Sequence, residues 1–169
     1  MAVVAGVDGG RRAIDRGATI LQLRAPMLSA RELEQQAREL VAASTVPGLV
    51  SARCDVVLAC GAAGVNLPER DISVADARRL LGDRIVGRSV HSVEAALTAE
   101  AEGADYVIFG PVWPSPSHPG GAPTGVKALA AVVQAVRIPV LAIGGIDAER
   151  ARMCLEAGAG GYAAITMFL

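Results

Sequence analysis

A Gly-Ala pair occurs four times in the chain, and each time a short apolar run follows it closely. The pairs are Gly17-Ala18, Gly61-Ala62, Gly103-Ala104 and Gly158-Ala159. Three of them follow a stretch of helical character, where glycine can adopt the left-handed conformation that ends a helix. The apolar runs have the length of buried strands. The pairs are 44, 42 and 55 residues apart, about two strand–helix units each, and this spacing predicts a (β/α) barrel.

Length and composition limit the size of such a barrel. The chain has 169 residues, of which 52% are hydrophobic and 3% aromatic, so its core is largely aliphatic. That composition suits strands covered on both faces, and we expect one domain spanning residues 1–169. A complete (β/α)8 barrel usually takes about 200 residues or more. We therefore expect a compact α/β barrel of the TIM type whose last helix is missing, which leaves apolar outer surface for a partner or further chain to cover.

Charge and cysteine content argue against several classes of protein. The formal net charge is −1 and no long basic run occurs, so nucleic-acid binding is not expected. Cys54, Cys60 and Cys154 are odd in number and lack CxxC spacing, which argues against a disulfide framework or a zinc site. The opening apolar stretch, 2–7, is too short for a signal peptide or a membrane span. We expect a cytoplasmic protein that does not engage a membrane.

Turn signals and apolar periodicity predict an alternation of strands and helices. Strands are predicted at 3–7, 20–24, 48–51, 65–67, 84–89, 106–109, 140–143 and 162–165. Helices are predicted at 11–16, 55–60, 92–102, 126–136 and 147–157, and two more begin at Ser29 and near Ser73. Ser29 and Glu32 have the spacing of a capping box. The segment 110–124, rich in proline and glycine, is predicted to be a long functional loop.

The strongest candidate for a binding site is the segment 142–147, Ala-Ile-Gly-Gly-Ile-Asp. Ligands of α/β barrels bind where strands end and helices begin. Gly144 and Gly145, directly after a strand, would expose backbone N–H groups, and the following helix would add the positive end of its dipole. Together with Thr166 after the last strand, they predict a phosphate site. The alternative is a tight turn that requires glycine for its geometry alone.

Other polar residues follow the remaining strands. Gln22 and Arg24 end the second strand, and an arginine there needs an anionic partner, either a ligand or a carboxylate of the protein. Asp71 could hold a metal ion or cap the helix that begins near Ser73, and taken alone the cap is favoured. His91 precedes a helix, where a lone histidine is more often a hydrogen-bond donor of the loop than a catalyst.

The long loop contains further candidates. Ser115 and Ser117 have hydroxyls that could hold phosphate oxygens. His118 beside them could close over a ligand, and the alternative is an exposed loop histidine. Trp113 could stack on a ring of the ligand or anchor the loop, and its indole N–H would need a hydrogen-bond partner if buried.

Several segments together resemble the thiamin phosphate synthase superfamily, which includes the synthase and the thiazole tautomerase TenI. The segments are 87–92 (Gly-Arg-Ser-Val-His-Ser), 104–111 (Ala-Asp-Tyr-Val-Ile-Phe-Gly-Pro), 114–118 (Pro-Ser-Pro-Ser-His) and 138–146 (Ile-Pro-Val-Leu-Ala-Ile-Gly-Gly-Ile). The resemblance extends from about residue 20 to the end of the chain. It implies a barrel that binds a thiazole phosphate and often forms a homodimer.

The synthase joins a pyrimidine diphosphate to a thiazole phosphate, and magnesium neutralises the leaving diphosphate. Its Gln-x-Arg-x-Lys pattern matches Gln22 and Arg24, whereas the lysine position holds Pro26. Of its two magnesium-binding aspartates, one corresponds to Ala52 and the other matches Asp71. The resemblance therefore implies Mg²⁺ at Asp71 with one carboxylate missing, and these losses remove charge that stabilises the departing diphosphate.

The rest of the synthase pattern is retained in part. Its serine after the fifth strand matches Ser89. Its Thr-Pro-Thr-Lys loop corresponds to 115–118, where Ser115 and Ser117 keep the hydroxyls and His118 replaces the lysine. The phosphate end of the site, with Gly144 and Gly145, matches best.

The motif at 87–92 is closer to the tautomerase branch. The histidine that this branch uses for proton transfer follows the glycine of the sixth strand, and here that position is Pro111, which cannot act as acid or base. The nearest replacement along the sequence is His118, the candidate catalytic residue.

Three hypotheses follow. The first is a TenI-like protein that binds a thiazole phosphate and isomerises it. The second is a working thiamin phosphate synthase with a rearranged metal site. The third is a barrel that senses a ligand without catalysis.

Overall fold

Eight parallel strands follow one another in chain order around a barrel in the computed structural model, which describes residues 1–115 and 122–168. They are β1 (Ala2–Val4), β2 (Leu21–Leu23), β3 (Gly48–Ser51), β4 (Gly64–Leu67), β5 (Ile85–Val90), β6 (Tyr106–Phe109), β7 (Val140–Ile143) and β8 (Gly161–Ala163). A bridge between Ala2 and Ala164 joins the two ends of the sheet, and the Val3 N–H donates to the Ala164 carbonyl at 2.9 Å. The predicted barrel is confirmed.

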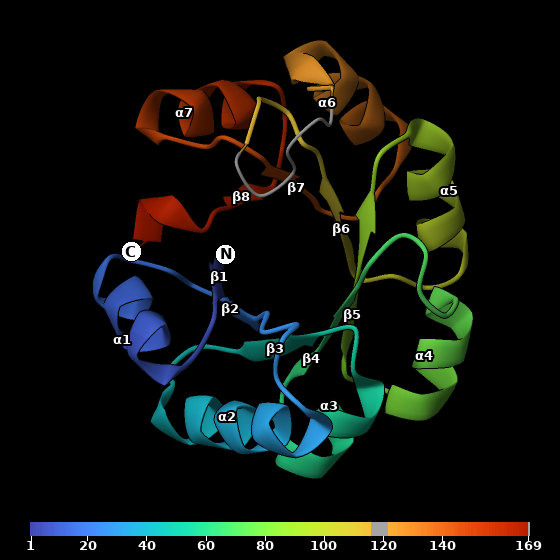
Figure 1. Ribbon diagram of the computed structural model, residues 1–169. Coiled ribbons are helices and arrows are strands. Elements are labelled where there is room, and N and C mark those ends of the chain that lie inside the picture. Colours follow the sequence, from blue (N-terminus) through green and yellow to red (C-terminus); the bar gives the residue numbers. More distant parts are fainter. Residues whose placement is uncertain (116–121, 169) are drawn as a thin grey trace.

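Helices form a ring outside the barrel (Figure 1). They are α1 (Val7–Asp15), α2 (Ala30–Ala43), α3 (Cys54–Cys60), α4 (Val74–Leu81), α5 (Val93–Ala101), α6 (Gly125–Ala135) and α7 (Ala148–Glu156). Between α7 and α1, in the part of the chain that the structure describes, the ring holds only the 3-10 helix η1 (Thr166–Phe168) and no eighth α-helix. Phe168 is buried and stacks on Tyr162, with ring centroids 6.3 Å apart, so η1 covers part of the surface expected to be bare.

The Gly-Ala pairs have the predicted role. The four glycines have φ angles of 85°, 72°, 93° and 89° in chain order, in the left-handed region. They follow or end α1, α3, α5 and α7, and the alanine after each is buried. Strands β2, β4, β6 and β8 then begin within a few residues. The repeat therefore marks every second helix-to-strand turn of the barrel.

The prediction for the first strand and helix is wrong. β1 ends at Val4 rather than at residue 7, and α1 begins at Val7 rather than at residue 11. Gly9 and Gly10 both lie in α1, although glycine is a weak helix former. A Cβ atom at Gly10 would lie 2.5 Å from Cδ1 of Leu40, so the missing side chain lets α1 approach α2 closely. This contact between helices outweighs the local preference of the sequence.

Side-chain caps begin several helices at the predicted positions. Ser29 accepts a hydrogen bond from the Glu32 N–H, and the Glu32 carboxylate accepts one from the Ser29 N–H at 2.8 Å, which completes the capping box. The side chains of Ser73, Ser92 and Asp147 cap α4, α5 and α7, each by accepting a hydrogen bond from the N–H three residues later. Each cap ends a connection that follows a strand, so these connections lie at the carboxyl ends of the strands.

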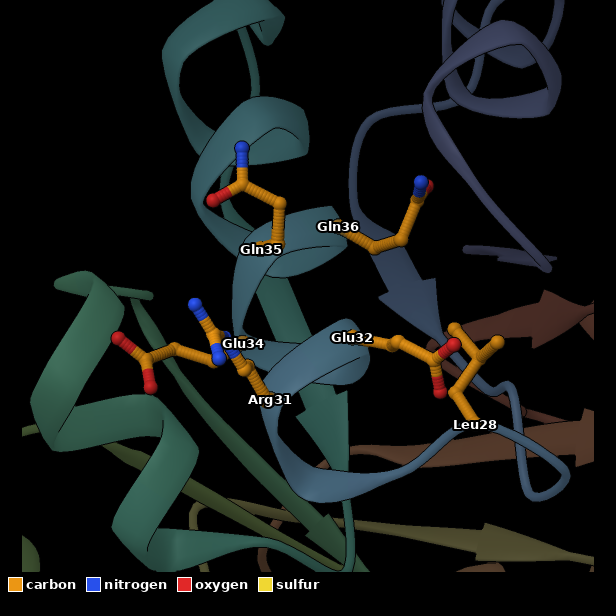
Figure 2. A pocket seen from close by; sticks show the side chains of 6 residues that line it. All are labelled: Leu28, Arg31, Glu32, Glu34, Gln35 and Gln36. Atoms are coloured by element: carbon orange, nitrogen blue, oxygen red, sulfur yellow. The ribbon is translucent and has the colours of Figure 1, made fainter.

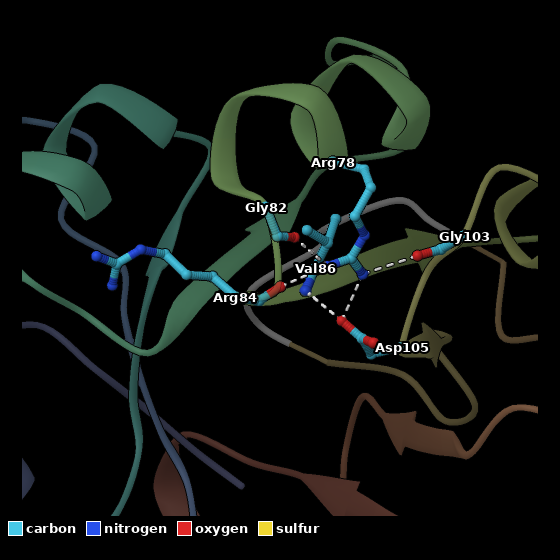
Figure 3. A network of polar contacts seen from close by, with 6 residues as sticks. All are labelled: Arg78, Gly82, Arg84, Val86, Gly103 and Asp105. Atoms are coloured by element: carbon cyan, nitrogen blue, oxygen red, sulfur yellow. Dashed lines mark hydrogen bonds and ion pairs between the residues drawn. The ribbon is translucent and has the colours of Figure 1, made fainter.

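The opposite end of the barrel is fixed by Arg78 of α4 (Figure 3). One guanidinium nitrogen donates to the carbonyls of Gly82 and Arg84 at 2.9 and 2.6 Å. The other donates to the Gly103 carbonyl at 2.8 Å and to the Asp105 carboxylate at 2.7 Å. Asp105 also accepts a hydrogen bond of 2.7 Å from the Val86 N–H. One side chain thus joins the end of α4 to the starts of β5 and β6.

Candidate functional site

A cavity of about 280 Å³ lies at the carboxyl ends of the strands. Most of the binding residues predicted from the sequence line it together: Gln22, Arg24, Ser89, Ser115, Gly144, Gly145 and Thr166. Ser117 and His118 lie outside the described residues. The structure therefore brings residues from five different strand ends around one space, as the barrel topology requires.

The turn after β7 lines this cavity. Gly144 and Gly145 have φ angles of 100° and 64°, which favour glycine at both positions. A Cβ atom at Gly145 would lie 2.6 Å from the Pro114 carbonyl oxygen, so the turn also packs closely against the loop after β6. Within the described residues, the N–H groups of Gly144, Gly145 and Ile146 donate no hydrogen bond. They are therefore available to an anionic ligand.

Two arginines, one in the cavity lining and one beside the turn, have different roles. Arg24 lines the cavity, is exposed and forms no ion pair with the residues that the structure describes. Arg150 donates to the Gly145 carbonyl at 2.7 Å, and its guanidinium lies 5.4 Å from the ring centroid of Trp113. Trp113 is half-buried and does not line the cavity. Trp113 therefore anchors the loop, and Arg24 is the arginine left for a ligand.

Gln22 contributes a buried polar atom without a partner. Its Nε2 donates to Oγ of Ser51 at 2.7 Å, while its Oε1 has no hydrogen-bond partner among the described residues. Gln22 is only 5% exposed, and an unpaired buried acceptor destabilises the folded state until a donor reaches it. Rotating the amide by half a turn exchanges the two roles, and either orientation leaves one polar atom for a ligand.

A chain of hydrogen bonds crosses the barrel interior beside it. The hydroxyl of Tyr106 donates to Oδ1 of Asn66 at 3.1 Å. The amide Nδ2 of Asn66 donates in turn to Oγ of Ser89 at 3.0 Å. Burial, followed by the charge of Asp105, raises the pKa of Tyr106 far above its usual range, so the phenol keeps its proton. Asn66 is its hydrogen-bond partner among the described residues, so the hydroxyl must donate to Oδ1. Asn66 and Ser89 line the cavity, whereas Tyr106 lies below it.

The motif at 87–92 organises one wall of the site. Arg88 donates to the carbonyls of Glu69 and Ile72, both at 2.6 Å. This holds the loop after β4 against β5 and brings the Glu69 carboxylate to Nδ1 of His91. Glu69 and His91 both line the cavity. Glu69 could not be predicted from the sequence, because 22 residues separate it from His91 and no local pattern marks it.

A second hollow, of about 660 Å³, lies along α2 on the outside of the barrel (Figure 2). Its lining residues are Leu28, Arg31, Glu32, Glu34, Gln35 and Gln36. The labelled side chains spread around the helix rather than converging on one point. This hollow contains none of the strand-end residues, so the cavity in the barrel mouth is the better candidate for a site.

Comparison with models of protein families identifies the family to which the chain belongs. A family model described as thiamine monophosphate synthase matches residues 6–168. The chain belongs to this family. The resemblance inferred from the motifs at 87–92, 104–111 and 138–146 is therefore confirmed.

Named relatives in the thiamine monophosphate synthase family are similar over most of their length. The chain is 40% identical to "Putative thiamine-phosphate synthase 2" of Aquifex aeolicus, with 92% of this chain and 86% of the relative covered. It is 39% identical to "Thiamine-phosphate synthase" of Chloroflexus aurantiacus, with 96% and 80% covered. A solved structure named "Thiamine phosphate pyrophosphorylase from Pyrococcus furiosus" matches with a TM-score of 0.89 and 34% identity, covering 98% of this chain and 83% of that one.

The residues of this family member do not fit a protein-held magnesium ion at the expected place. Ala52 supplies no carboxylate, and Asp71 does not line the cavity. The Asp71 side chain instead accepts a hydrogen bond of 2.8 Å from the Ile72 N–H, and Ser73 is the cap of α4. No three His, Cys, Asp or Glu side chains gather to hold a metal ion in 1–115 or 122–168.

None of the helices in the described residues is both long and apolar enough to cross a membrane.

Proposed function

We propose that the protein binds a thiazole phosphate in the barrel mouth. The phosphoryl group would lie at the turn formed by Gly144 and Gly145, and the ring would lie deeper, between Gln22 and Ser89. The free N–H groups of the turn carry this proposal, because a phosphoryl oxygen is the acceptor that such groups bind at the start of a helix. The α7 dipole adds positive charge at this turn, and the guanidinium of Arg24 adds positive charge to the lining of the cavity.

We further propose that the bound thiazole is isomerised by proton transfer through His91. An isomerisation that moves one proton between two atoms of the ligand needs a group that accepts a proton and returns it, and an imidazole ring can do both. Glu69 holds Nδ1 of His91, which leaves Nε2 available to the ligand. His118, the candidate from the sequence, lies outside the described residues.

Thiamin phosphate synthesis is the second candidate function. The names of the similar proteins from Aquifex aeolicus and Chloroflexus aurantiacus favour it. It requires a pyrimidine diphosphate as a second substrate, and Pro26 and Ala52 supply none of the charge that the family pattern provides for that group.

Calorimetry with thiazole phosphate tests the binding proposal. We expect the wild-type protein to bind, and Gly145→Ala to bind at least about tenfold more weakly, because the new Cβ would displace the loop at Pro114. Gly17→Ala is the matched control, since Gly17 also has a positive φ but has no atom within 4 Å of the Cβ position. An intact fold without any heat of binding would contradict the proposal.

Turnover assays separate the candidate reactions. Proton NMR of thiazole phosphate with enzyme in deuterated water should show isomerisation or ring-proton exchange, and Glu69→Gln should slow it by about 10²-fold. A second incubation adds the pyrimidine diphosphate and Mg²⁺, and formation of thiamin phosphate would support the synthase instead. Binding with neither product would favour the ligand-sensing barrel.

A further inference from the structure

The barrel interior contains a polar group that the proposed function does not use. Tyr106 is the large polar side chain in a cluster that otherwise consists of aliphatic residues at the centre of the barrel. It does not line the cavity and so cannot touch a ligand there. A phenylalanine at this position would fill the same volume without a hydroxyl that needs a partner when buried.

The register of the sheet shows how the Tyr106 hydroxyl reaches its acceptor. Asn66, Gly87 and Tyr106 are paired side by side on β4, β5 and β6. A Cβ atom at Gly87 would lie 2.0 Å from Cζ of Tyr106, so the tyrosine ring crosses β5 through space that only glycine leaves free. Its hydroxyl then meets Asn66 on the far side of Gly87, at 3.1 Å.

The protonated phenol determines the orientation of the amide. Because the tyrosine must donate, the atom of Asn66 that faces it is the oxygen, and Nδ2 faces Ser89. Ser89 therefore accepts from Asn66, and the hydrogen of its own hydroxyl is left to donate elsewhere. Ser89 and Asn66 both border the cavity, where a ligand acceptor would be the recipient.

We propose that Tyr106 is a positioning residue, which directs the hydroxyl hydrogen of Ser89 into the candidate site through Asn66. Without the tyrosine hydroxyl, Oδ1 of Asn66 loses its donor and becomes an acceptor that competes with the ligand for the Ser89 hydrogen. The effect on the ligand rests on the proposed function, whereas the hydrogen-bond chain itself does not.

A double-mutant cycle measures the effect on the ligand. We expect Tyr106→Phe to weaken thiazole phosphate binding about tenfold in the wild-type background, and by less than about twofold when Ser89→Ala is already present. A merely structural role would weaken binding equally in both backgrounds and would overturn the inference. Tyr162→Phe is the matched control, because Tyr162 packs against Phe168 and does not line the cavity. It should leave binding unchanged.

A measurement without ligand keeps the two proposals distinguishable. The side-chain NH₂ protons of Asn66, assigned by their loss in Asn66→Ser, should exchange with solvent at least about tenfold faster in Tyr106→Phe than in the wild type, because the amide is no longer held. Equal exchange would refute the role of Tyr106 even if thiazole phosphate binds. If the wild type does not bind, the proposed function fails and this measurement alone decides whether Tyr106 holds Asn66.

Discussion

Gly87 makes the polar interior of the barrel possible. The residue beside it on β6, Tyr106, lies across its backbone, and Asn66 meets the hydroxyl from β4. The sequence marks Gly87 only as the first letter of a motif, because its necessity arises from a ring on a neighbouring strand. Ser89, two residues further along β5, faces the cavity above it.

Burial of Tyr106 predicts a specific loss of stability in alkali. Its pKa is raised in the folded protein, so in the unfolded chain the phenol ionises above about pH 10 while in the folded barrel it does not. The stability that it contributes is complete below pH 10 and declines as the pH rises further. At about pH 11 the free energy of unfolding should have fallen by about 1.4 kcal/mol more in the wild type than in Tyr106→Phe.

Denaturant unfolding at a series of pH values up to about 11 checks this expectation. Groups common to both proteins cancel in the comparison, since only the phenol differs. Parallel stability curves for the wild type and Tyr106→Phe would show that the tyrosine ionises as readily in the folded state as in the unfolded one.

At the scale of the elements, α1 is the helix whose observed start differs from the start that its sequence predicts. Local signals place its start at residue 11, because two glycines precede that point, whereas packing on α2 places the start at Val7. The starts of α2, α4 and α5 were predictable because their caps are local: Ser29, Ser73 and Ser92 bond to groups three residues away. A packing requirement between helices has no such local mark.

Adjacent glycines of α1 should therefore respond to alanine in opposite ways. Gly9→Ala should stabilise the protein by about 0.5–1 kcal/mol, because alanine favours the helix and its Cβ would meet only Val4 at an ordinary 3.6 Å. Gly10→Ala should destabilise it by about 1 kcal/mol, because the same gain is outweighed by overlap with Leu40 at 2.5 Å. Thermal unfolding of both variants gives the sign of each change. A stabilised Gly10→Ala variant would mean that α1 and α2 are not closely packed.

At the scale of the whole molecule, one end of the barrel carries the candidate binding site and the other end contributes to stability. The carboxyl ends of the strands carry the cavity, and the amino ends of β5 and β6 carry the Arg78 network. Barrels in general keep binding and stability apart in this way. A change at the Arg78 end should alter stability without altering the affinity for a ligand.

Arg78→Ala tests this separation. We expect it to lower the free energy of unfolding by about 2 kcal/mol, because four acceptors lose a charged donor. Thiazole phosphate affinity measured well below the unfolding temperature should stay within about twofold. Arg79→Ala is the control. Among the described residues Arg79 forms only an exposed pair with Asp76, so its loss should change stability by less than about 0.5 kcal/mol. Reduced affinity in Arg78→Ala would show that the two ends are coupled.

The candidate site was predictable in the parts that follow from strand order. Gln22, Ser89 and Gly144 come directly after or at the end of strands, so the topology alone brings them to one mouth. Glu69 and Tyr106 could not be predicted in this way. The first depends on a loop that Arg88 holds through backbone carbonyls, and the second depends on cross-strand register.

The joint between β1 and β8 has a consequence for the local opening of the barrel. Seven of the eight joints around the barrel are strand ladders, whereas this one is a single bridge at Ala2 and Ala164. We therefore expect thermal opening of the barrel to begin at this joint. Ala164 also borders the cavity. We therefore expect a ligand in the barrel mouth to hold the β1–β8 joint closed, so that binding and stabilisation of the barrel occur together.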